Sequence, residues 1–159
     1  MCIRDSISGA TMAIAAGIWV EDSIPLIEDS IVSRSDNGIF VRHITDGWTT
    51  RPTFVSVVVE NSMYRGVMVE QYNHSQYSNL PLNAIFNDIT VRGTGGTGAK
   101  TSGLSVAAFD INTSGVHIDI GLIEDNSAVG LRGYMIDSST IINRLNIIGN
   151  GNPLSLIHI

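Results

Sequence analysis

Short stretches of alternating apolar and polar residues return along the chain, each opened by a glycine. Aligned on that glycine they are Gly17-Ile18-Trp19-Val20, Gly38-Ile39-Phe40-Val41, Gly66-Val67-Met68-Val69, Gly103-Leu104-Ser105-Val106 and Gly130-Leu131-Arg132-Gly133. Alternation with a period of two is typical of β-strands. The residues one and three positions after the glycine therefore share a face, and we expect that face to point into a core.

A second kind of apolar run lies before each of the later glycines and once after the last of them. These runs are LIEDSIV, FVSVVVENS, AIFNDITV, HIDIGLIEDNS and TIINRLNIIGN. Two strands per repeat, joined by turns of variable length, predict a solenoid in which successive coils stack. Neighbouring coils would pair in parallel about 4.8 Å apart, with each Ile or Val over its counterpart. Glycine is expected at the start of the strand because a sharp turn there needs a positive φ.

The G-[I/V/L]-x-V strands, the ENS and EDNS turns and the irregular repeat length resemble the right-handed parallel β-helix, or pectin-lyase-like, superfamily. The resemblance covers nearly all of residues 13–152 and implies an all-β, right-handed parallel β-helix (solenoid) of about five coils, truncated at both ends. Its motifs say little about activity, because the superfamily includes polysaccharide lyases, glycoside hydrolases, viral tailspikes and adhesins. An antiparallel sandwich is the alternative fold; it explains short strands but not the recurrent glycine register.

The two ends of the chain share one inverted DNA sequence. The codons ATG TGT ATA AGA GAC AG encode MCIRDS, and their reverse complement encodes LSLIHI. The pair resembles the mosaic end of transposase-based sequencing adapters. We therefore interpret residues 1–6 and 154–159 as translated adapter and residues 7–153 as a parallel β-helix fragment. A genuine apolar C-terminal strand is the alternative interpretation of LSLIHI.

Composition restricts the possible binding partners of the protein more than it restricts the possible activities. A net charge of −6 argues against nucleic acid, because phosphate binding needs clustered Lys and Arg. The single cysteine, Cys2, lies in the adapter segment, so no disulfide is expected, and no metal or cofactor is predicted. No apolar run reaches the roughly 18 residues of a membrane span. The stretch TGGTGAKT resembles a phosphate loop, but Ala99 stands before the lysine and a strand pattern follows, so a glycine-rich turn is expected.

Large apolar residues occupy the outward position two after the glycine in three repeats: Trp19, Phe40 and Met68. Such a row suits a sugar-stacking platform, a subunit interface or a surface covered by a flanking segment. Residues of alternating sign follow two positions later and predict a charge ladder between coils: Glu21, Arg42 and Glu70. A polar column is expected five residues before the glycines, where side chains bond to backbone groups at a corner: Ser33, Asn61 and Asp125.

Two long loops after the glycine strands form the predicted functional surface, RHITDGWTTRPT in the second coil and EQYNHSQYSNLP in the third. Because consecutive coils stack, the loops should lie side by side on one flank. They would bring together His43, Asp46, Trp48, Arg51, Tyr72, His74 and Tyr77. Aromatic faces stack on sugars while Arg, Asp and His bind hydroxyls or carboxylates, so the mixture predicts a glycan cleft. Two ordinary solvated loops are the alternative.

Within this surface, the predicted substrate-binding residues are Trp48, Arg51, Tyr72, His74 and Tyr77. Asp46 and Arg51 are the candidate catalytic residues, as a carboxylate and as a cation, although neither lies in a recognised catalytic motif. His43 and His74 lack the spacing of a zinc site, so surface or internally bonded histidines are expected.

Two classes of function are compatible with these patterns. One is a tailspike- or adhesin-like module on an extracellular or virion surface, which binds a polysaccharide or cell-surface glycan and for which a homotrimer is one assembly. The other is a secreted polysaccharide lyase or glycoside hydrolase. We prefer the first because the β-helix pattern is clear and no catalytic motif is present. The patterns are thus compatible with an enzyme and with a binding protein that has no catalytic activity.

Overall fold

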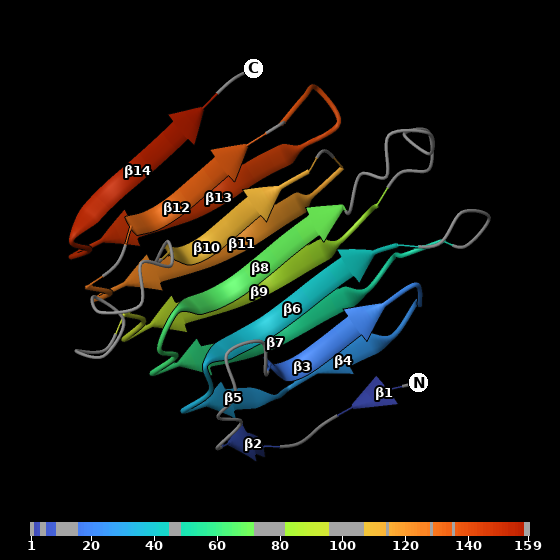
Figure 1. Cartoon of the computed structure of the whole chain (residues 1–159), viewed down its shortest axis with the longest axis horizontal. Helices are drawn as coiled ribbons and strands as arrows, with labels where there is room; N and C mark the ends of the chain where they lie inside the picture. The colour runs from blue at the N-terminus through green and yellow to red at the C-terminus, as the bar shows by residue number, and fades with distance from the viewer. Residues whose placement is uncertain are drawn as a thin grey trace.

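The computed structural model describes residues 2–3, 6–8, 16–44, 49–71, 82–95, 107–113, 115–127, 129–134 and 136–157. These residues form strands and turns and contain no helix, so the all-β prediction is confirmed. In this part of the chain there is accordingly no helix that could span a membrane. The strands lie in two facing layers (Figure 1).

One layer is an eight-stranded sheet. Its main path runs through β1 (Cys2–Ile3), β4 (Leu26–Glu28), β7 (Thr53–Glu60), β9 (Ile85–Arg92), β11 (His117–Glu124) and β13 (Ile141–Ile148). Off this path, β2 (Ser6–Ser8) pairs with β5 (Ile31–Ser33), which also pairs with β7. The strands β1 and β2 lie within or next to the segment interpreted as adapter, and that interpretation stays a prediction.

The other layer is a six-stranded sheet. Its order is β14 (Asn152–Ile157), β12 (Val129–Tyr134), β10 (Ala107–Asn112), β8 (Arg65–Gln71), β6 (Asn37–His43) and β3 (Ala16–Glu21). From β6 onward, successive strands lie alternately in the two sheets, and neighbouring strands within each sheet are parallel. The antiparallel sandwich is therefore wrong, and the arrangement is compatible with a parallel β-helix.

The core lies between the two sheets and follows the predicted alternation. Ile39 and Val41 of β6 are fully buried, as are Val67 and Val69 of β8 above them. From the opposite sheet, Phe86 of β9 completes a stack of aromatic rings: Phe54 and Phe86 have ring centroids 4.8 Å apart and an interplanar angle of 4°, and Phe86 meets Phe109 edge-on at 5.0 Å. The inward-facing prediction for the second and third repeats is thus confirmed.

The predicted register of the fourth repeat is wrong. The strand that pairs with β8 is β10, in which Ala107 lies beside Arg65 and Phe109 beside Val67. Ala108 therefore occupies the glycine position of this coil, while Gly103 and the three residues after it lie outside the described residues. The stretch FDIN, which follows the predicted strand, forms most of β10 instead. This register places Phe109 in the core, where it packs against Phe86.

The reason for the recurrent glycine also differs from the prediction. Gly17, Gly38 and Gly66 do not have positive φ. A Cβ atom at Gly38 would instead come closer than 3.0 Å to the Val59 side chain and to the carbonyl oxygen of Gly66. Glycine is required because Val59 of the facing sheet and the backbone of the neighbouring strand leave no room for a Cβ atom, not because the backbone turns.

We expect Gly38→Ala to lower the free energy of unfolding by about 1–3 kcal/mol, because the added methyl group has to displace packed atoms. Urea denaturation of the variant and of its parent measures this loss. Gly151→Ala is the control, since Gly151 is exposed and has no positive φ, and it should change stability by only a few tenths of a kcal/mol. Equal effects of the two substitutions would contradict the close-approach explanation.

A polar column lines one corner, one or two residues later than predicted. The residues with positive φ at this corner are Arg34, Asn61, Gly93, Asp125 and Gly149. The polar side chains of the column belong to the residue that follows each of these positions. Asn126 is an example: its Nδ2 donates to the carbonyl oxygens of Val91 and Glu124, at 3.2 and 2.9 Å. The backbone N–H of Thr94 donates to Asn126 Oδ1 at 2.7 Å. Side chains do bond to the backbone at this corner, although Ser33 belongs to β5.

Candidate ligand-binding face

Most of the predicted loop site lies outside the described residues. This applies to Asp46, Trp48, Tyr72, His74 and Tyr77. Arg51 is described: its side chain is exposed, and its backbone N–H donates to the carbonyl oxygen of Ser23 at 3.1 Å. The glycan cleft between the two long loops therefore stays a prediction.

His43, at the start of the first long loop, is an internally bonded histidine. It is 4% exposed, and its Nδ1 lies 2.8 Å from Thr50 Oγ1 and 3.0 Å from Asp22 Oδ1. Asp22 Oδ1 also accepts the backbone N–H of Ile44 at 3.0 Å. Thr50 Oγ1 donates to the same oxygen at 3.4 Å, so Asp22 contacts residues on both sides of the segment that carries the predicted Asp46 and Trp48. His43 is therefore a buried histidine whose Nδ1 is bonded within the protein, as expected.

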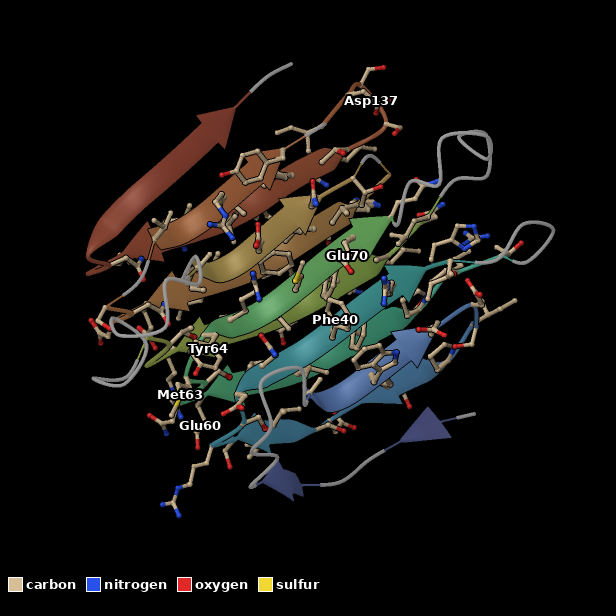
Figure 2. All side chains as sticks on the ribbon, in the orientation of Figure 1. Phe40, Glu60, Met63, Tyr64, Glu70 and Asp137 are labelled. Carbon is tan, nitrogen blue, oxygen red and sulfur yellow. The ribbon has the colours of Figure 1, made fainter. Side chains whose placement is uncertain are left out.

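The outward apolar row lies on the outer face of the six-stranded sheet, where Phe40 and Glu70 project from β6 and β8 (Figure 2). Trp19 is beside Phe40, and Phe40 is beside Met68. The Trp19 and Phe40 rings meet edge-on, with centroids 4.6 Å apart and an interplanar angle of 72°. Trp19 remains 43% exposed and offers a flat apolar surface to a ligand.

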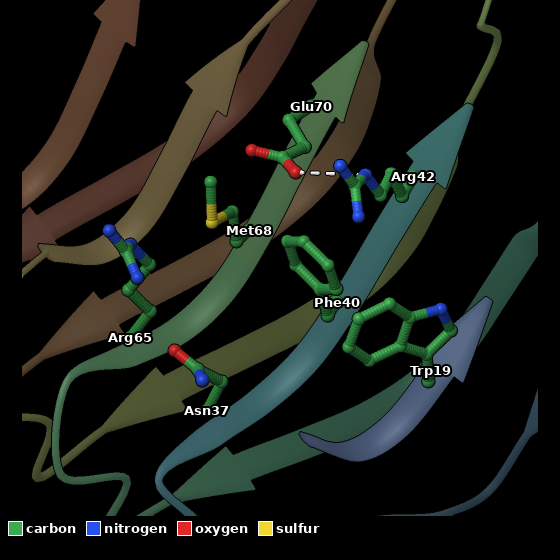
Figure 3. Close-up of a pocket in the computed structure, with 7 residues that line it drawn as sticks. All are labelled: Trp19, Asn37, Phe40, Arg42, Arg65, Met68 and Glu70. Atoms are coloured by element: carbon green, nitrogen blue, oxygen red, sulfur yellow. Dashed lines mark ion pairs between the residues drawn. The ribbon is translucent and has the colours of Figure 1, made fainter. Parts of the chain in front are cut away.

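This row forms the floor of a concavity of about 210 Å³, shown in Figure 3. Its polar lining residues are Asn37, Arg42, Arg65 and Glu70. Arg42 Nε and Glu70 Oε1 form an ion pair at 3.2 Å, which confirms that part of the charge ladder. At the other end, Trp19 Nε1 donates to Glu21 Oε2 at 3.2 Å and holds the indole ring in place.

A second concavity, of about 330 Å³, continues from the first across β10 and β12. Its lining residues are Arg65, Met68, Asp110, Asn112, Arg132 and Tyr134, so Arg65 and Met68 line both concavities. Asp110 lies beside Met68, and Arg132 lies beside Asp110, which makes them the next two members of the outward row. The row therefore changes from apolar at β3 to charged at β12.

Two guanidinium groups share the Asp110 carboxylate. Arg132 Nε donates to Asp110 Oδ1 at 3.0 Å, and Arg132 Nη2 donates to Oδ2. Arg65 Nε donates to Asp110 Oδ2 at 3.2 Å. Burial opposes the charge on Arg132, but the hydrogen bonds and charge of Asp110 outweigh it and raise the pKa of Arg132. The arrangement holds two cations on one anion in a place that is largely shielded from water.

Sequence reasoning missed Arg65, Asp110 and Arg132. The repeat could have placed Arg132 in the outward row, because Arg132 stands two residues after Gly130, as Trp19 stands two residues after Gly17. Asp110 was not predicted to belong to the outward row because the fourth repeat was aligned on Gly103. Arg65 directly precedes Gly66, a position to which the repeat assigned no role.

Comparison with known proteins provides no relative for this chain: no family model, no curated protein and no solved structure matches it. Among the described residues, no group of three or more metal-binding side chains is close enough to hold an ion. The chemistry of this face therefore rests on its own residues.

Glu70 should make the free energy of unfolding depend on pH. Burial raises the pKa of Glu70 and outweighs the nearby Arg42 and Arg65, which lower it. The folded protein then holds this proton more tightly than the unfolded chain, so the contribution of Glu70 to stability is full below its ordinary value of 4.5 and is lost as the pH rises through the folded pKa. Replacing Glu70 with Gln should flatten the fall in the free energy of unfolding above pH 4.5, as measured by urea denaturation at a series of pH values.

Asp119→Asn supplies a control of opposite sign. Hydrogen bonds from Asn143 and Arg144 lower the pKa of Asp119, so its contribution is present above 3.8 and is lost on acidification. This variant should change the acid side of the stability profile and leave the range above pH 4.5 as in the parent. A Glu70→Gln profile that runs parallel to the parent above pH 4.5 would show that burial does not dominate at Glu70.

Proposed function

We propose that the two sheets are walls of a right-handed parallel β-helix of about five coils, and that the protein binds a glycan on an extracellular or virion surface. The alternation of successive strands between two parallel sheets supports this architecture. Right-handedness is the expected sense, because connections between parallel strands of one sheet are right-handed in the great majority of folds. The pectin-lyase-like resemblance of the repeat points the same way.

The observation that carries the binding proposal is the exposed indole of Trp19 beside a concavity with polar walls. An aromatic ring packs against the C–H face of a sugar, while Asn, Arg and Glu side chains bind its hydroxyl groups. Strands stack about 4.8 Å apart, so the row from Trp19 on β3 to Arg132 on β12 extends over roughly 19 Å. That length suits a chain of several sugars that crosses the strands.

A glycan array tests the proposal with the intact chain and two variants. Trp19→Ala should weaken the binding of each retained glycan about tenfold, the effect of losing about 1.4 kcal/mol of stacking. Ile24→Ala is the control, because Ile24 is 64% exposed and does not line the concavity, and its binding should match the parent's. The proposal fails if the parent retains no glycan, or if both substitutions weaken binding equally.

A second candidate function, a secreted polysaccharide lyase or glycoside hydrolase, is favoured by the two carboxylates on this face. Glu70 is a half-buried acid with a raised pKa, whereas Asp110 is held by two guanidinium groups. Carboxyl groups in contrasting environments are what acid–base hydrolysis requires. Release of reducing ends or unsaturated products from a bound glycan, abolished by Glu70→Gln, would establish the enzyme. Binding without either product would leave a recognition module.

The apolar row has an alternative use as a contact between three copies of the chain. A homotrimer that buries Trp19 would shield the indole from soluble fluorescence quenchers. Dilution, or substitution of Trp19, would dissociate the trimer and lower the sedimenting mass. Sedimentation of the parent and of Trp19→Ala distinguishes the two uses. A monomeric parent that binds glycan favours the platform.

A further inference from the structure

We propose that the ligand of this face is an acidic saccharide, whose carboxylate or sulfate group lies against Arg65 and Arg132 while a neutral ring stacks on Trp19. This inference rests on the proposed glycan-binding function and names the class of ligand. It follows from the charge balance of the second concavity, from the free hydrogen-bonding capacity of Arg65 and from the continuity of the two concavities.

The charge balance of the second concavity is positive. The charged residues that line the two concavities are three cations, Arg42, Arg65 and Arg132, and two anions, Glu70 and Asp110. Arg42 pairs with Glu70, which leaves Asp110 to neutralise two guanidinium groups. One positive charge remains on a chain whose net charge is −6. Because Asp110 is 2% exposed and Arg132 is 8% exposed, water screens this excess charge poorly.

Arg65 has hydrogen-bonding capacity left for a ligand. In the part of the chain that the structure describes, it donates its Nε–H to Asp110, and no other bond from its guanidinium group is made. The side chain is 19% exposed, and its two terminal nitrogens carry four N–H groups. Paired N–H groups of this kind bind a carboxylate or a sulfate with two parallel hydrogen bonds. Arg65 is therefore the residue expected to touch the anionic group.

The second concavity offers space and further polar groups around that contact. Its volume is about 330 Å³, and Asn112 and Tyr134 line it together with the charged residues. The Arg132 guanidinium lies 5.5 Å from the centre of the Tyr134 ring, which keeps the cation on the outer face. Because Arg65 and Met68 also line the first concavity, a ligand that stacks on Trp19 can reach the cations without leaving the surface.

Three polymers distinguish the possible anions: hyaluronan oligosaccharides carry carboxylates, dextran sulfate oligosaccharides carry sulfates, and dextran is neutral. Titration calorimetry of the intact chain at about 20 mM and about 150 mM salt should show binding of at least one acidic polymer over dextran, weakened by salt. Arg65→Gln should weaken that binding about tenfold to a hundredfold, the equivalent of losing charge-assisted hydrogen bonds. In this variant Arg132 still pairs with Asp110, so the fold should be retained.

Arg92→Gln is the matched control, because Arg92 is an exposed arginine that pairs with Glu60 on the other sheet. It should leave binding at the parent's level. Binding of hyaluronan alone identifies a carboxylate, binding of dextran sulfate alone identifies a sulfate, and binding of both shows selection by charge. The inference is overturned if neither acidic polymer binds, or if Arg65→Gln and Arg92→Gln have equal effects. If the array shows Trp19-dependent binding of neutral glycans only, the proposed function stands and this inference falls; if no glycan is retained, both fall.

Discussion

Replacing Asp110 with alanine should lower the free energy of unfolding by about 3–5 kcal/mol, because the change leaves two facing guanidinium groups without their shared carboxylate. Arg132 is only 8% exposed, so its charge cannot be transferred to water without moving the strand that carries it. Urea denaturation of the intact chain measures the loss. The same variant should lose the contacts with Asp110 that hold Arg65 and Arg132 in place at the ligand site.

Two further variants separate charge imbalance from loss of a side chain. Asp119→Ala removes a solvent-exposed carboxylate that pairs with Arg144 on the other sheet, and it should cost much less than Asp110→Ala. Combining Asp110→Ala with Arg132→Met should recover part of the loss, because an apolar side chain replaces an unpaired buried cation. Equal losses at Asp110 and Asp119, or no recovery in the double variant, would contradict this account.

The parts of the fold that the sequence predicted are those governed by local alternation. Ile39 and Val41 point inward and Phe40 outward because side chains alternate along a strand, whichever strand lies next to it. The same rule placed Trp19 and Met68 on one outer face. Parallel pairing then aligned them, since each glycine marks an equivalent position in its coil.

The parts that the sequence did not predict depend on contacts between distant residues. Two overlapping alternations, after Gly103 and after Ala108, compete for the fourth coil, and the packing of Phe109 against Phe86 decides between them. The glycine requirement has the same origin, because the atoms that exclude a side chain at Gly38 belong to Val59 and Gly66. These contacts between distant residues cannot be predicted from a local sequence pattern.

The candidate site likewise has a part that the sequence predicted and a part that depends on contacts between distant residues. The sequence emphasised the long loops, whose composition is polar and aromatic, and the described residues leave most of that prediction untested. The charged half of the sheet face arises only when Arg65, Asp110 and Arg132 meet across three strands, at sequence separations of 45 and 22 residues. Assigning the fourth coil to β10 would have placed Asp110 and Arg132 in the outward row. Their mutual ion pairing still requires the folded structure.

Phe86→Ala should lower the free energy of unfolding by about 3–5 kcal/mol, because a fully buried ring is lost and the cavity cannot close between two rigid sheets. Phe86 contacts a ring on either side, stacked on Phe54 at 4.8 Å and edge-on to Phe109 at 5.0 Å, so the substitution removes two aromatic pairs. Phe54→Ala removes one of these pairs from an equally buried position and should cost less. A double-mutant cycle for Phe54 and Phe86, measured by urea denaturation, should give a coupling energy of about 0.5–1.5 kcal/mol. Zero coupling would mean that burial of each ring, and not the stack between the coils, accounts for the loss.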